Sequence, residues 1–169
     1  MVIYNGKKEA DETAMEKLAK DYRAFLDAGK TERECVTELV REAEANGYVN
    51  LETKLAAGEK IQPGDKVYAV GMKKIMTLFH VGQEPLEKGM NILGAHIDSP
   101  RLDVKQNPLY EDTDLAYLDT HYYGGVKKYQ WVAIPLAIHG VIVKKDGSVV
   151  DVVIGEDEND PIVYITDLL

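Results

Sequence analysis

The stretch that most constrains the fold is an apolar run, Met90–Leu93, followed at once by Gly94-Ala95-His96-Ile97-Asp98. A near-continuous apolar run of this kind is typical of a strand covered on both faces, as in an α/β layer structure. His96 then stands at the C-terminal end of the predicted buried strand. Residues two apart in an extended segment point to the same side, so we expect the Asp98 carboxylate beside the His96 ring.

This pairing favours a metal site. A carboxylate can hold the proton on one imidazole nitrogen and aim the other nitrogen outward, and metal-binding histidines usually have such a partner. The α/β sheets bind their ligands beyond the carboxyl ends of strands. Gly94 and Ala95 are small enough for an ion or substrate to approach the backbone. We therefore identify His96 as the candidate metal ligand and Asp98 as the candidate catalytic carboxylate that orients it.

The simpler interpretation is structural, because a lone histidine after a strand is more often hydrogen-bonded structure than a metal ligand. His80 and His139 lie in strand-like segments and are interpreted as structural. His121 lies in an aromatic, glycine-rich loop and is the second choice for a functional histidine. The sequence contains no HExxH, cysteine cluster or Walker loop, so no other cofactor-binding residue is proposed. A Ser-His-Asp triad stays open, although Ser99 lacks the Gly-x-Ser-x-Gly context of a nucleophile elbow.

Composition excludes several classes of function. The chain has 169 residues, enough for one ordinary domain or for a small domain and part of another. Its formal net charge of −9 argues against a nucleic-acid partner. No apolar run approaches the roughly 18 residues of a membrane span. The single cysteine, Cys35, rules out an internal disulfide framework and fits a core residue in a reducing cytoplasm. We expect a cytoplasmic protein with no membrane or nucleic-acid partner.

The first third of the sequence predicts two helices. Apolar residues recur at steps of three and four between Met15 and Leu26, which gives one apolar face. Gly29 is expected to end this helix in a left-handed cap. Thr31-Glu32-Arg33-Glu34 has the pattern of a capping box at the start of a second helix. That helix has a buried stripe between Val36 and Ala43 and ends at Gly47.

From Gly58 onward the pattern changes to short strands, and the fold class is therefore α/β with a mixed sheet. Asp146-Gly147 is among the strongest short hairpin signals and joins two of the predicted strands. The acidic run Glu156–Asp160 is interpreted as a solvated loop, with a calcium loop as the alternative. The predicted strands are Lys66–Val70, Ile75–Val81, a long apolar run over Trp131–Val143, Val149–Ile154 and Ile162–Ile165.

The change in character beyond Pro100 predicts a boundary near Lys105–Asp112. We place an α/β part over residues 1–106 and a β-rich part over residues 107–169. The sequence stops on two leucines directly after a predicted strand. Because natural termini usually lie at the surface, we expect the chain to be incomplete.

Two blocks carry a resemblance to a known family. Asn91–Tyr110, which reads NILGAHIDSPRLDVKQNPLY, resembles the segment around the first metal ligand of the zinc aminopeptidases of the aminopeptidase I and aspartyl aminopeptidase group. His121–Trp131, which reads HYYGGVKKYQW, resembles the start of the domain inserted in those enzymes and is nearer the bacterial aminopeptidase I branch. The two blocks occur in the family's order, and the resemblance covers essentially the whole chain.

The resemblance implies that residues 1–106 are the N-terminal segment of the catalytic domain and that residues 107–169 begin an inserted β-rich domain used for dimerisation. It implies that His96 is the first metal ligand of a two-metal centre, usually zinc, and that Asp98 orients it. It also implies peptide substrates that lose their N-terminal residues, and a homo-oligomer. The remaining ligands and the general-base glutamate of the family lie beyond the inserted domain.

Because a catalytic zinc takes about three protein ligands, we expect this chain to be an N-terminal fragment that is inactive alone. The alternative from another functional class is a non-catalytic binding or assembly module derived from the same family. An active form that continues past Leu169 would favour the first interpretation. A folded, oligomeric, metal-free product ending at Leu169 would favour the second.

Overall fold

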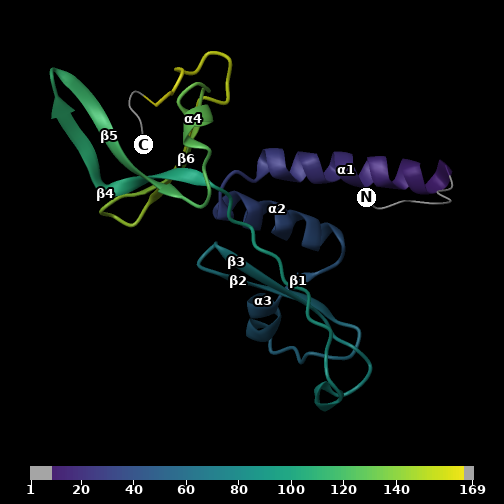
Figure 1. The fold of residues 1–169 in the computed structure, drawn as a ribbon. Coiled ribbons are helices and arrows are strands. Elements are labelled where there is room, and N and C mark those ends of the chain that lie inside the picture. Colours follow the sequence, from purple (N-terminus) through teal and green to yellow (C-terminus); the bar gives the residue numbers. More distant parts are fainter. Residues whose placement is uncertain (1–8, 166–169) are drawn as a thin grey trace. The chain divides into compact units, whose positions relative to one another are not determined.

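The computed structural model describes the backbone of residues 9–165 and the side chains of residues 12–165. The chain divides into two compact units, one ending at Ile97 and the other beginning at Asp98. Figure 1 shows the elements of each unit, which are described separately below. Helices and strands occur together in a mixed α/β fold, as the sequence predicts.

The first unit begins with the two predicted helices, α1 (Glu9–Ala28) and α2 (Glu32–Ala45). The capping box is confirmed: the Thr31 hydroxyl accepts a hydrogen bond from the Glu34 amide at 3.4 Å. In return, the Thr31 amide donates to a Glu34 carboxylate oxygen at 2.8 Å. Gly47 has a φ of 81°, the left-handed conformation that lets the chain turn away after α2.

Gly29 follows the end of α1, as predicted, but the predicted left-handed conformation is wrong. Its φ is not positive, and its amide donates to the Phe25 carbonyl at 2.9 Å. A Cβ at Gly29 would lie 2.8 Å from the Cys35 sulfur and 3.2 Å from the Phe25 carbonyl oxygen. Glycine is therefore required here by close packing between the end of α1 and the start of α2, not by a left-handed backbone.

A small mixed sheet follows. The short strand β1 (Val49–Asn50) runs parallel to β2 (Lys66–Gly71), and β2 pairs antiparallel with β3 (Ile75–His80). Both longer strands are predicted from the sequence. A third helix, α3 (Leu51–Ala56), is not, because six residues are too few to show a helical period. Asn50 caps it by accepting hydrogen bonds from two amides of its first turn.

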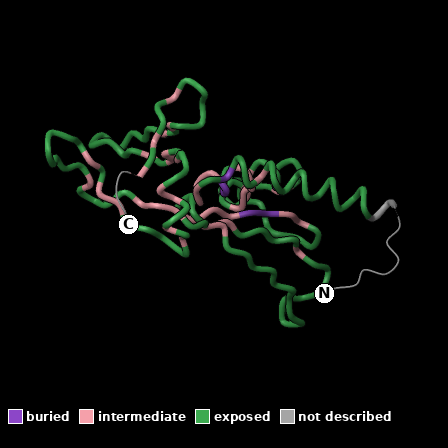
Figure 2. Tube along the Cα trace, turned by 45° about the horizontal axis from the view of Figure 1, so that its top comes forward, coloured by how far each residue is buried: buried purple, intermediate pink, exposed green. Residues whose placement is uncertain are grey.

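The core of this unit lies between α2 and β2. The buried apolar residues, purple in Figure 2, are Cys35, Val36, Ala43, Val67 and Tyr68. The Tyr68 hydroxyl donates to a Glu44 carboxylate oxygen at 2.7 Å, and this contact together with burial raises the pKa of Tyr68. Burial also raises the pKa of the Cys35 thiol, with a smaller effect of Glu34. Cys35 is a core residue, as predicted.

The predicted buried strand before His96 is absent. After the 3-10 turn η1 (Leu86–Lys88), residues 89–100 form neither helix nor strand. Ile92 is 81% exposed and Leu93 is 99% exposed. A strand needs neighbours that bond its amides and cover its side chains, and among the described residues no strand pairs with this segment. The apolar pattern therefore predicts buried side chains, whereas Ile92 and Leu93 are exposed in this unit.

The second unit opens with a long hairpin of β4 (Arg101–Asp112) and β5 (Leu115–Tyr123). Near its open end, Arg101 pairs with Tyr123 and Asp103 pairs with His121. The register shifts between Val104 and Leu109, and this irregular stretch contains Pro108, which has no amide to contribute to a ladder. The domain boundary predicted at residues 106/107 falls within β4 and stays a prediction.

A second hairpin confirms another prediction. Strand β6 (Ile138–Val143) pairs with β7 (Val149–Ile154) around the Asp146-Gly147 turn, where Gly147 has a φ of 85°. The rest of the apolar run is not a strand: Trp131 ends the short helix α4 (Lys128–Trp131), and residues 132–137 form turns and irregular structure with one isolated bridge at Leu136. The predicted strand Ile162–Ile165 is reduced to one bridge between Val163 and Leu136.

Two hairpin turns place side chains in the left-handed region. Met72 and Lys73 join β2 to β3 at φ of 50° and 57°. Thr113 and Asp114 join β4 to β5 at φ of 51° and 62°. Turns of this form prefer Asn-Gly or Asp-Gly, because a Cβ is strained at positive φ.

The acidic run Glu156–Asp160 is a loop with mostly exposed residues, as predicted. Its hydrogen bonds are local: an Asp160 carboxylate oxygen accepts from the Gly155 amide at 2.7 Å. Among the described residues, no helix combines the length and the apolar character that crossing a membrane requires.

Candidate functional site

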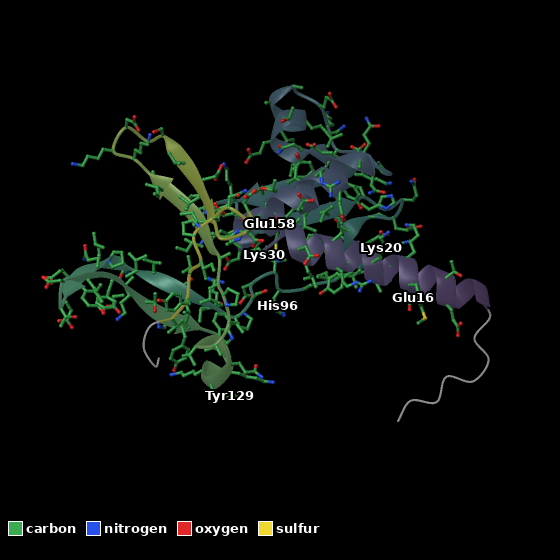
Figure 3. All side chains as sticks on the ribbon, turned by 90° about the horizontal axis from the view of Figure 1, so that it is seen from above. Glu16, Lys20, Lys30, His96, Tyr129 and Glu158 are labelled. Carbon is green, nitrogen blue, oxygen red and sulfur yellow. The ribbon has the colours of Figure 1, made fainter. Side chains whose placement is uncertain are left out.

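His96 lies near the end of the first unit, on the segment without regular structure. Its side chain is exposed and is labelled in Figure 3. The next residue, Ile97, is half-buried, and its carbonyl lies 3.6 Å from the Cys35 sulfur of α2. This contact ties the backbone of the residue after His96 to the start of α2.

Asp98 begins the second unit and is half-buried. Its Oδ2 atom accepts a hydrogen bond from the Tyr123 hydroxyl at 2.7 Å. The two residues are 25 positions apart and meet because the β4–β5 hairpin returns the chain to its starting point. Tyr123 is the last residue of β5 and pairs with Arg101, three residues after Asp98.

A cationic side chain covers the Tyr123 ring. The Arg101 guanidinium carbon lies 4.3 Å from the ring centroid, within the range of a cation–π contact. The Arg101 Nε atom donates to an Asp103 carboxylate oxygen at 2.7 Å. Arg101 is thereby held in place on both sides, and Asp98, Tyr123, Arg101 and Asp103 form one connected polar cluster.

Gly124 allows the hairpin to close tightly beside this cluster. It follows Tyr123 with a φ of 73°, and a Cβ there would lie 3.4 Å from the Pro100 Cα. The turn therefore passes close against the residue that precedes β4. The glycine of the Tyr123-Gly124-Gly125 motif has a structural role that the sequence pattern alone does not reveal.

The other histidines lie elsewhere. His121 is in strand β5 and not in a loop, so the prediction of its local structure is wrong; strand pairing with Asp103 sets its position. Its ring packs against Tyr122 at 5.9 Å between centroids. His139 is half-buried in β6 with its Nε2 atom 2.9 Å from a Glu156 carboxylate oxygen, which confirms a satisfied sheet histidine. His80 is exposed at the end of β3.

The donor chemistry fits one ligand of a metal centre. An exposed imidazole at His96 is a suitable zinc ligand, and a carboxylate two residues on is a suitable partner for it. Over residues 12–165, no three His, Cys, Asp or Glu side chains converge in a group that could hold a metal ion. A complete centre would need donors in addition to those of the described residues.

The relationship to known proteins is specific. The family model described as "Aminopeptidase I zinc metalloprotease (M18)" matches residues 25–169. The chain belongs to the M18 peptidase family. This result confirms the resemblance carried by the Asn91–Tyr110 and His121–Trp131 blocks.

Bacterial M18 members resemble the chain over most of its length. A "Probable M18 family aminopeptidase 1" from Clostridium acetobutylicum is 62% identical over 90% of this chain, which is 33% of that relative. The crystal structure of aminopeptidase I from Borrelia burgdorferi B31 superposes with a TM-score of 0.86 at 38% identity. The match covers 96% of this chain and 39% of the Borrelia chain. An M18 structure from Thermotoga maritima has a TM-score of 0.84 at 42% identity. That match covers 100% of this chain and 36% of the Thermotoga chain.

The chain thus spans about a third of the length of these M18 relatives. More distant structures share the fold only. A Saccharomyces cerevisiae structure described as a dodecamer has a TM-score of 0.72 at 19% identity.

The sequence predicts His96 and Asp98 as site residues but does not predict the contact of Tyr123 with Asp98 or that of Arg101 with the Tyr123 ring. Both follow from the pairing register of β4 with β5, and no local pattern fixes that register across an irregular strand. The alternation Arg101-Leu102-Asp103-Val104-Lys105 predicts the first strand. Tyr122-Tyr123 before two glycines is a usable sign of the end of its partner.

Proposed function

We propose that the protein carrying this sequence is a metallo-aminopeptidase that removes N-terminal residues from peptides. The observation that carries the proposal is the M18 match over residues 25–169, which includes the whole His96-x-Asp98 motif. In this proposal His96 is a ligand of a two-metal centre, usually zinc, and Asp98 orients its ring. Bound zinc polarises a peptide carbonyl and makes water more acidic.

In that chemistry, this chain contributes one metal ligand and the carboxylate that orients it. His96 contributes one donor, and an ordered carboxylate at Asp98 keeps the imidazole proton on the nitrogen that faces it. The other donors and the general base would come from outside the described residues. We therefore propose that residues 1–169 by themselves have no peptidase activity.

The test uses the product of the complete reading frame that encodes this sequence. We expect this product to hydrolyse leucyl- or aspartyl-anilides with added Zn²⁺ or Co²⁺, and the 169-residue chain to hydrolyse neither. The His96→Ala variant should lose activity by about 100-fold or more, because loss of a ligand's partner alone costs roughly 10- to 100-fold. The His80→Ala variant is the matched control, since His80 is also exposed and lies on β3.

Two outcomes would count against the proposal. Full activity in His96→Ala would contradict the assignment of His96 as a metal ligand. A complete product that is folded, metal-free and inactive would favour the alternative of a binding or assembly module.

We further propose a cytoplasmic homo-oligomer in which residues 107–169 form the contact domain and residues 1–106 belong to the catalytic domain. The two hairpins of the second unit support this, because each exposes large apolar side chains on sheets of only two strands. The measurement is the solution mass of the product by light scattering, and a monomer over the micromolar range would contradict it. Exposed examples are Leu109, Leu118, Ile142, Val143 and Val153.

A further inference from the structure

The Tyr123 hydroxyl is placed to hold the Asp98 carboxylate in one orientation. Their 2.7 Å separation is that of a short hydrogen bond from a phenol to a carboxylate. A carboxylate free to rotate about its bond to Cβ would present its oxygens to a neighbour only part of the time. A fixed donor on Oδ2 reduces that freedom.

The donor is itself rigid. Tyr123 ends β5 and is fixed by its pairing with Arg101. The Arg101 guanidinium lies on its ring at 4.3 Å, and Asp103 holds Arg101 through a 2.7 Å contact. The support for Asp98 is therefore built on paired strands.

We propose that Tyr123 is a positioning residue, which acts through Asp98 on the metal ligand His96. The proposal rests on the proposed function, because Asp98 matters to the reaction only if His96 binds metal. Arg101 contributes by holding the Tyr123 ring. Tyr123 has no direct contact with metal or substrate in this role.

The first experiment measures the contact in the 169-residue chain. The ¹³C shift of the Asp98 carboxyl carbon is assigned by its loss in Asp98→Asn and then compared between variants. Tyr123→Phe removes only the hydroxyl and should move this signal. Tyr122→Phe is the matched control, because it removes a hydroxyl from the preceding residue. Among the described residues, the Tyr122 hydroxyl has no hydrogen-bond partner.

The second experiment measures zinc affinity, by competition with a chelator, in the product of the complete reading frame. We expect Tyr123→Phe to weaken zinc binding about tenfold, the lower end of what partners of metal ligands contribute, with an unchanged melting temperature. In an Asp98→Ala background the same change should have no effect, because the residue through which it acts is gone. A merely structural role would give the same loss in both backgrounds.

The outcomes separate the two proposals. Equal zinc affinity and equal Asp98 shifts in Tyr123→Phe and Tyr122→Phe would overturn the positioning role while leaving the aminopeptidase assignment intact. A wild-type product that neither binds zinc nor releases N-terminal residues would overturn the proposed function before any variant is made, and the role of Tyr123 with it.

Discussion

Gly29 is buried where α1 gives way to α2, and its lack of a side chain lets the Cys35 thiol approach its backbone. The Cys35 sulfur lies 3.4 Å from the Gly29 carbonyl oxygen, a distance suited to a weak S–H donor. At this position a glycine is a packing residue. Gly47 differs, because a Cβ there would meet no atom within 4 Å, and its positive φ makes the requirement for glycine purely conformational.

This contrast gives a prediction. Gly29→Ala should lower the free energy of unfolding by about 1–3 kcal/mol through overpacking. Gly47→Ala should lower it by about 1 kcal/mol through strain at positive φ. Urea denaturation measures both. Combining each with Cys35→Ala separates the causes, because the smaller side chain should relieve Gly29→Ala and leave Gly47→Ala unchanged. Additive effects at Gly29 and Cys35 would contradict the packing account.

At the scale of elements, α1, α2 and the β6–β7 hairpin are predictable because their causes are local. A capping box at Thr31, a helical apolar period and an Asp-Gly turn each act within a few residues. The segment before His96 differs, since a strand forms only when distant residues supply its neighbours. For the same reason the sequence predicts Asp98 as a candidate but not its bond to Tyr123, which depends on hairpin register.

The β6–β7 turn makes a prediction about pH. An Asp146 carboxylate oxygen accepts from the Ser148 hydroxyl at 2.7 Å and from its amide at 2.9 Å, and these bonds lower the pKa of Asp146 below 3.8. Since the folded-state pKa is lowered, the turn is stabilised above pH 3.8 and loses this contribution as the pH falls through the lowered value. A carboxyl ¹³C titration should place the Asp146 midpoint below 3.8.

Ser148→Ala should raise that midpoint toward 3.8, because the hydroxyl is the largest cause of the lowered pKa. Asn159→Ala serves as the control: Asn159 lowers the pKa of Asp157 in the neighbouring loop and does not contact Asp146. An Asp146 midpoint that is unmoved by Ser148→Ala would show that the turn is not held by this contact.

At the scale of the whole molecule, the division between the two units falls between His96 and Asp98. The candidate metal ligand and the carboxylate proposed to orient it therefore belong to different compact units. Each is supported within its own unit, by the Ile97–Cys35 contact on one side and by Tyr123 on the other.

Among the described residues, the exposed segment before this division should be the first point of proteolysis. Chymotrypsin at low concentration should cut the 169-residue chain near Leu93, which is 99% exposed and lies outside any helix or strand. Mass spectrometry of the first two fragments locates the cut. Replacing Ile92 and Leu93 by serine should slow the cut at this site. A first cut within β2, β3 or the β4–β5 hairpin would contradict the assignment of this segment as the least protected.

The left-handed turns have a consequence for how the hairpins respond to substitution. Each turn places two non-glycine residues at positive φ, which costs about 1 kcal/mol or more of stability per residue. The turns therefore destabilise the hairpins that they close. Contacts between the paired strands must offset this cost. In β4–β5, the stacking of Tyr110 on Tyr117 at 5.3 Å lies near the turn and offsets part of this cost. A substitution that removes this stacking would therefore leave the strained turn without its nearest aromatic support.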